Sequence, residues 1–273
     1  GMTLDIGGEP DHVEITAGDR VLGNADDAGA LTAQFGSLGP LTLTATAFDK
    51  AGMPAATATV DVTIDDPQVA DCKAWLDLYK LDYTSGPTNL GITDPVTVTL
   101  PLNGVAYRYS GNTTDRKTLY GDCTLMKSLA QAAPILRAHD VTKLVDIGIY
   151  NYRCIDQSLT PPNCSMSQHS YAKAIDIAEL VTSADVHYSV LKDWVIDSGG
   201  TTCAAATENE KDAFLHQVIC ELKTAMVWNI VLTPNYNSDH RNHFHVDLTK
   251  NSDFIKRTSS ELVEPIVDGA FAD

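Results

Sequence analysis

The sequence predicts an α+β fold preceded by an all-β segment, and three features lead to this prediction. Residues 1–66 consist of short Val, Thr, Ala and Leu runs that Gly, Asp and Pro interrupt. Beyond residue 120, two stretches carry apolar residues at helical spacing, and short β-type runs accompany them. All six cysteines and all but one of the eight histidines lie after residue 66. We therefore expect a small antiparallel sheet with flanking helices, preceded by an immunoglobulin-like β-sandwich.

The first 66 residues are expected to form this sandwich. Residues 11–18 and 30–36 read as two of its strands. Residues 41–49 and 57–65 alternate strictly between apolar and polar side chains, which is the pattern of half-buried strands. Residues 48–57, "FDKAGMPAAT", would supply the hairpin turn between them. The segment holds no cluster of chemically capable side chains, so we expect spacing or adhesion from it rather than chemistry.

Residues 67–119 are predicted to be a linker followed by an elaboration of the next domain, which either extends its sheet or stays irregular. That domain spans residues 120–273. Its clearest helix lies within residues 123–141, and a second amphipathic helix is expected within residues 208–226. Short strands are expected at residues 142–154, 174–180 and 227–233.

Composition excludes several classes of partner. The chain has 273 residues and a formal net charge of −17, with 19 basic residues against 36 acidic ones. No basic stripe is available to displace the counterions of a nucleic acid or to bind an anionic membrane. No apolar run approaches the ~20 residues that a membrane-spanning helix needs. We expect a monomer that binds no nucleic acid and has no transmembrane segment.

The six cysteines indicate an oxidising compartment. None falls in a C-x-x-C pair, which argues against a thiolate zinc finger or a thioredoxin-type motif. Three disulfides between neighbours in the sequence are expected, with free buried thiols as the alternative. The pairs would be Cys72–Cys123, Cys154–Cys164 and Cys203–Cys220. The N-terminus shows no signal peptide, and the Gly before the first Met is typical of a cleaved tag. We therefore expect a periplasmic, cell-surface or secreted protein whose export signal has been removed.

One short stretch, "SDHRNHFHVDL", places three histidines within six positions. Read as a strand, residues 242–248 put His243, His245 and Asp247 on one face. Phe244, Val246 and Leu248 take the other face, which is apolar enough to be core. This pattern favours the wall of a metal site, because histidine is the commonest metal ligand. A surface cluster of histidines, or core histidines satisfied by hydrogen bonds, would give the same pattern.

A second segment, "CSMSQHSYAKAIDIAEL", offers partners for these histidines. His169 is expected in a loop, and Asp176 seven residues later on a strand. Together with His245 they make two imidazoles and one carboxylate, which suits zinc with a fourth position for water. Arg153, which precedes this segment, could bind a substrate carboxylate through its bidentate fork.

These residues carry a resemblance to a known superfamily. S-x-H-x-x-G-x-A-x-D is the signature of the zinc D-alanyl-D-alanine carboxypeptidases, which are grouped with lysostaphin-like peptidases, murein endopeptidase and the hedgehog signalling domain. Here it reads Ser167, His169, Ala172, Ala174 and Asp176, with Ala172 at the glycine position. The second motif, H-x-H on a strand, is matched by His243 and His245. The chain most resembles the bacterial extensin-like C-terminal family over roughly residues 120–250, through "YNYR", "SQHSYAKAIDIA" and "NYNSDHRNHFHVDL".

The resemblance implies a role for each residue. His169, Asp176 and His245 would bind zinc at a site like that of the hedgehog domain and the D-Ala-D-Ala peptidases. His243 would lie beside the zinc-bound water, whose pKa the metal lowers toward ~7. Arg153 would hold a substrate carboxylate or carbonyl oxygen. His240 takes the place of a further active-site histidine of murein endopeptidase.

One departure from the superfamily bears on the substrate. Many D,D-carboxypeptidases carry a glutamate base three residues before the last ligand, where this chain has Asn242. Because an amide cannot accept the proton, that work would fall to His243, with His240 or Asp239 assisting. We expect an exported zinc peptidase that cleaves a cross-link or stem peptide of peptidoglycan. The alternatives are an inactive, zinc-stabilised cell-wall-binding module and a metal-free structural cluster.

Overall fold

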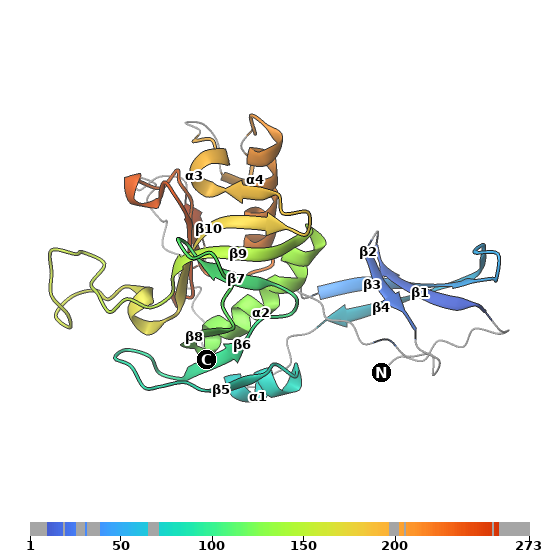
Figure 1. The fold of residues 1–273 in the computed structure, drawn as a ribbon, viewed down its shortest axis with the longest axis horizontal. Coiled ribbons are helices and arrows are strands. Elements are labelled where there is room, and N and C mark those ends of the chain that lie inside the picture. The colour runs from blue at the N-terminus through green and yellow to red at the C-terminus, as the bar shows by residue number, and fades with distance from the viewer. Residues whose placement is uncertain are drawn as a thin grey trace, which may run out of the picture. The chain divides into compact units, whose positions relative to one another are not determined.

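A computed structural model describes residues 10–18, 20–25, 31, 39–64, 71–196, 202–204, 206–252 and 254–256 (Figure 1). The chain divides into two compact units, residues 1–70 and residues 71–273, and each is described by itself. The mixed class predicted from the sequence is confirmed: the described residues form several largely antiparallel sheets and few helices.

The described part of the first unit forms one four-stranded antiparallel sheet in the order β2–β1–β3–β4. Its strands are β1 (His12–Ala17), β2 (Arg20–Asn24), β3 (Gly39–Phe48) and β4 (Pro54–Ile64). Alternation along β3 has the predicted effect, because Ala45 and Ala47 are buried while Thr42 is exposed. The predicted hairpin joins β3 to β4, and Asp49 Oδ1 fixes its turn by accepting the N–H groups of Ala51 and Met53. The strand expected at residues 30–36 lies almost wholly outside the described residues, as do residues 67–70 at the start of the predicted linker.

The main sheet of the second unit is larger than the small antiparallel sheet expected from the sequence. It has seven strands, with a path of β14–β12–β13–β10–β9–β7 and with β11 paired to β10. The pairs β7–β9 and β12–β14 are parallel, and the other pairs are antiparallel. Figure 1 shows β7, β9 and β10 side by side. The strands are β7 (Ala106–Tyr109), β9 (Val141–Gly148), β10 (Ala174–Thr182), β11 (His187–Ser189), β12 (Ile230–Leu232), β13 (Phe244–Asp247) and β14 (Phe254–Lys256).

Both predicted helices are present. α2 (Cys123–Ala138) begins where the Asp122 side chain accepts the N–H of Thr124, and most of its side chains are buried. α4 (Glu210–Thr224) begins at Asn209, whose side chain accepts two backbone N–H groups. Two shorter α-helices, α1 (Cys72–Leu78) and α3 (Val190–Asp193), complete the α-helices of the described residues, beside 3-10 turns at η1 (Gln168–Tyr171), η2 (Thr202–Ala204) and η3 (Ser238–His240).

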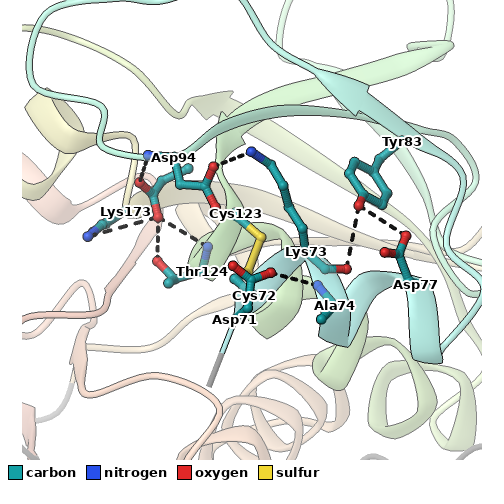
Figure 2. Close-up of a disulfide and its surroundings, with 11 residues drawn as sticks. Asp71, Cys72, Lys73, Ala74, Asp77, Tyr83, Asp94, Cys123, Thr124 and Lys173 are labelled. Carbon is teal, nitrogen blue, oxygen red and sulfur yellow. Dashed lines mark hydrogen bonds and ion pairs between the residues drawn. A yellow bond between two sulfur atoms is a disulfide. The ribbon is translucent and has the colours of Figure 1, made fainter. Parts of the chain in front are cut away.

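The sequence left open whether residues 67–119 extend the main sheet or stay irregular, and the structure shows the first alternative only in part. β7 extends the main sheet, whereas β5 (Tyr83–Ser85), β6 (Pro95–Thr99) and β8 (Thr118–Asp122) form a separate three-stranded sheet. Figure 2 shows how the start of α1 is tied to the start of α2. Lys73 of α1 pairs with Asp94, whose backbone N–H donates to the buried carboxylate of Asp122, the residue that caps α2. The disulfide Cys72–Cys123 joins the first residues of the two helices.

All three predicted disulfides are present: Cys72–Cys123, Cys154–Cys164 and Cys203–Cys220. No described cysteine is free. Within the described ranges, none of the helices combines the length and apolar character needed to cross a membrane.

Candidate functional site

Two neighbouring strands bring the two sequence motifs together. β10 and β13 pair antiparallel, and Asp176 lies directly opposite His245 in their register. Phe244 and Val246 point away from this face and are buried, as the alternation predicted. The strand β13 covers Phe244–Asp247 and is shorter than the expected residues 242–248, so that His243 lies just before its first residue. Pairing thus fixes the separation of the Asp176 and His245 side chains on one face of the sheet.

The loop before β10 supplies His169. Ser167 caps the short turn η1 by accepting the N–H of His169, and Ala172 ends the turn in the left-handed region at φ 51°. Ala172 occupies the glycine position of the motif, and a left-handed conformation is what glycine favours there. His169 is buried, and its Nδ1 donates to the carbonyl oxygen of Ile149 at 2.8 Å. Because a carbonyl can only accept, the His169 Nε2 is left without a proton when the ring is neutral, and it faces the strands.

Three ligand-type atoms converge at this point. His169 Nε2 lies 3.2 Å from Asp176 Oδ1 and 3.1 Å from His245 Nδ1, and His245 Nδ1 lies 2.9 Å from Asp176 Oδ1. In a tetrahedral zinc site with bonds of ~2.0 Å, ligand atoms are separated by about 3.3 Å. These residues form the one group of this kind among the described residues, and they could hold a metal ion.

His245 is held between two carboxylates. Its Nε2 donates to Asp247 Oδ2 at 3.0 Å while its Nδ1 faces Asp176. Burial alone would lower the pKa of His245, but hydrogen bonds to Asp176 and Asp247 outweigh it and raise the pKa to about 9. Burial raises the pKa of Asp176, but its interactions with His169 and His245 outweigh burial and hold this pKa well below the usual range. Without a metal, a proton on His245 stabilises the cluster.

Two further histidines flank the cluster. His243 Nε2 lies 3.4 Å from Asp176 Oδ1, and its Nδ1 lies 2.8 Å from the side-chain oxygen of Asn242. The His240 ring centroid is 5.1 Å from that of His243 and 5.8 Å from that of His245. Burial, followed by the charges of the neighbouring histidines, lowers the pKa of His240 to about 4, and burial also lowers the pKa of His243. Both rings are therefore neutral near pH 7 and able to accept a proton.

Arg153 is attached to the same loop through its backbone. Its N–H donates to Ser170 Oγ at 2.8 Å, and its carbonyl oxygen accepts from Ser170 Oγ and from the N–H of Ser167. The guanidinium makes one long contact, at 3.4 Å, with the carbonyl oxygen of Cys154. Among the described residues, no carboxylate pairs with the guanidinium, and no hydrogen bond links the guanidinium to the side chains of His169, Asp176 or His245. A half-buried cation without a counter-ion is suited to binding an anionic group.

Sequence reasoning missed a buried acid near the cluster. Asp146 on β9 is fully buried and accepts a 2.7 Å bond from Arg116 Nη2. Burial outweighs this pairing and raises the pKa of Asp146 to about 6, with a smaller contribution from the charge of Asp176. A lone Asp inside the apolar run "LVDIG" was the available signal. The roles of Asn237 and Ser170 as hydrogen-bond partners had no such signal.

Comparisons with curated proteins and with solved structures returned no match. A comparison with protein families did return one, over a range that contains every candidate site residue named above and also β5 to β8. The chain belongs to the family described as extensin-like protein C-terminus, whose model matches residues 80–256.

Proposed function

We propose that this chain is an exported zinc-dependent peptidase, related to the D-alanyl-D-alanine carboxypeptidases and murein endopeptidase, that hydrolyses a cross-link or stem peptide of cell-wall peptidoglycan. The observation that carries this proposal is the convergence of His169, Asp176 and His245 beside two neutral histidines. Three disulfides support an oxidising compartment outside the cytoplasm.

The donor set suits zinc. Two imidazole nitrogens and one carboxylate oxygen match catalytic zinc sites, which keep a fourth position for water or substrate. Both imidazoles also carry the outer partners that such ligands have, since His169 donates to the Ile149 carbonyl and His245 to the Asp247 carboxylate. These partners orient the rings so that the nitrogens facing the centre are free of protons once a cation replaces the proton on His245.

The surrounding residues would perform the proton transfers and the binding of substrate. Zinc, when bound, polarises a carbonyl and makes water nucleophilic near neutral pH. His243, with Nε2 close to Asp176, would accept the proton of the attacking water and return it to the leaving amine, with His240 assisting. Arg153 would bind a carboxylate or carbonyl oxygen of the peptide. Asn242 cannot act as the base, which points to a longer wall peptide rather than a simple dipeptide.

A second candidate is an inactive, zinc-stabilised cell-wall-binding module. The observation in its favour is Asn242 at the position where many relatives of the D,D-carboxypeptidase type carry glutamate. In either case we propose that the first unit is an immunoglobulin-like sandwich used for spacing or adhesion. The three-ligand cluster favours the peptidase, because a purely structural zinc site uses four protein ligands.

Metal content and hydrolysis of purified peptidoglycan separate these candidates. Wild-type protein should contain about one zinc per chain, and His245→Ala should lose it. His243→Ala should keep the zinc and lose the release of peptide fragments, measured by chromatography of the digest. His187→Ala, which removes a part-exposed histidine paired with Glu179, should change neither.

Each contrary result has a defined meaning. A wild-type protein that takes up no zinc, even from excess metal, would remove both zinc candidates and leave a structural cluster. Zinc without any hydrolysis would favour the binding module. Full activity in His243→Ala would show that another group is the base.

A further inference from the structure

Asn237, which precedes η3, makes three contacts through its side-chain oxygen. This oxygen accepts the N–H of Asp239 at 3.1 Å and the N–H of His240 at 3.2 Å. The same oxygen lies 2.6 Å from Nδ1 of the His240 ring. Two backbone donors therefore identify the atom as the amide oxygen, because the amide nitrogen carries hydrogens and could not accept them.

This arrangement determines which ring nitrogen of His240 carries the proton. An amide oxygen can only accept, so Nδ1 of His240 must be the donor in the 2.6 Å contact. A neutral imidazole has one N–H, which leaves Nε2 as the nitrogen that can accept a proton.

The segment that carries Asn237 and His240 is held in place from both ends. Arg241 Nη1 donates to the carbonyl oxygen of Pro234 at 2.8 Å, which closes the loop on itself. Asn235 accepts a 3.3 Å bond from the buried Trp194, whose ring packs edge-on against Phe244 of β13. The His240 ring lies beside His243 and His245 as a result, and the ring is oriented by contacts that the metal ligands do not supply.

We propose that Asn237 is a positioning residue that fixes the Nδ1–H tautomer of His240, so that Nε2 serves as a proton acceptor beside the cluster. This inference rests on the proposed function, because it assigns Asn237 and His240 to proton transfer in that same site. A neutral amide suits this task better than a carboxylate, since a carboxylate would favour the charged ring that cannot accept a proton. Asn242 makes a similar 2.8 Å contact with His243, but within the described part of the chain no second donor fixes the orientation of its amide.

The tautomer can be measured directly by two-dimensional NMR that correlates the ring protons of histidine with both ring nitrogens. In zinc-loaded wild-type protein at pH 7, His240 should show a protonated Nδ1 and an unprotonated Nε2. Asn237→Ala should shift population to the Nε2–H form, with the zinc content unchanged. Asn237→Asp retains the acceptor and the backbone bonds, so it should keep Nδ1 protonated while the ring takes up its second proton at a higher pH.

Asn209 provides a matched control. Its side-chain oxygen also accepts two backbone N–H groups, of Lys211 and Asp212, at the start of α4, but no histidine ring of the described residues contacts that oxygen. Asn209→Ala should therefore lower stability through the same loss of a cap and leave the His240 spectrum unchanged.

On peptidoglycan, Asn237→Ala should lower kcat by at least about tenfold with little change in KM, whereas Asn209→Ala should change neither.

The outcomes separate this inference from the proposed function. An Nε2–H tautomer in wild-type His240, or a spectrum that Asn237→Ala does not change, would overturn the role of Asn237. Normal kcat in Asn237→Ala with an altered tautomer would overturn the link to proton transfer. Absence of hydrolysis by the wild-type protein would instead refute the peptidase, and the spectra would still decide the tautomer.

Discussion

The candidate site has two walls of different construction. The strand wall, residues 243–247, is held by a β-ladder, since β13 pairs with β10 on one side and β12 on the other. The loop wall, residues 167–172, is a single 3-10 turn with no ladder of its own. Regular pairing determines where the His245 ring lies, whereas the position of His169 depends on contacts made by neighbouring segments. The loop wall should therefore be the easier wall to disturb.

The contacts that hold the loop wall come from residues 149–155. Ile149 accepts from the His169 ring, and Asn151 N–H donates to the carbonyl oxygen of His169 at 3.1 Å. Cys154 forms an isolated bridge with Met166, and the disulfide Cys154–Cys164 closes the same pair of segments. The disulfide is thus the covalent counterpart of the hydrogen bonds that the strand wall obtains from the sheet.

The largest predicted effect is on the loop wall. The double variant Cys154→Ser, Cys164→Ser opens the disulfide loop, and ordering that loop again would cost about 3 kcal/mol. If the binding of zinc must supply this free energy, the affinity of the protein for zinc should fall by up to about a hundredfold. Cys203→Ser with Cys220→Ser is the control, because its disulfide joins η2 to α4 across 17 residues instead of 10 and, since the cost varies only with the logarithm of loop length, should cost similar stability. Zinc affinity is measured by competition with a chromophoric chelator, and equal affinity in both double variants would contradict the difference between the walls.

The next prediction concerns the strand wall and pH. Because the pKa of His245 is raised from 6.5 to about 9, its proton stabilises the metal-free fold fully below pH ~6.5, and this stabilisation is lost as the pH rises through about 9. Zinc must displace that proton, so zinc affinity should rise about tenfold per pH unit between pH 7 and 9. The lowered pKa of Asp176 keeps this carboxylate ionised throughout the range.

Two measurements check this pH dependence. The midpoint of thermal unfolding of chelator-treated protein should fall from pH 7 to pH 9. The zinc affinity, measured by chelator competition, should rise over the same range. Zinc affinity that does not change between pH 7 and 9 would mean that His245 carries no proton in the metal-free protein.

The same contrast explains what the sequence could predict. Period-2 alternation predicted that His245 and Asp247 lie on one face of their strand and Phe244 and Val246 on the other, because alternation is a local property of any strand. The disulfides were predicted by pairing consecutive cysteines, which is a local argument for Cys154–Cys164 and Cys203–Cys220 but not for Cys72–Cys123, whose residues are 51 positions apart. The parallel pairing of β7 with β9 and of β14 with β12, the counter-ion of Asp146 and the amide contact of Asn237 could not be predicted, since each depends on residues brought close only by the whole fold.

The smallest predicted effect is that of Asp247→Asn, because two consequences of the change oppose each other. Loss of the carboxylate that accepts from His245 Nε2 should weaken zinc binding by about tenfold, as for other outer partners of metal ligands. The same loss lowers the pKa of His245 and so reduces the competition from protons. At pH 7 we therefore expect only a few-fold loss of zinc affinity, which grows toward tenfold at pH 9, where proton competition has largely ended. Glu179→Gln, which alters a carboxylate paired with His187 outside the site, should show no change at either pH. A loss for Asp247→Asn that is larger at pH 7 than at pH 9 would contradict the assignment of Asp247 as one of the two carboxylates that raise the pKa of His245.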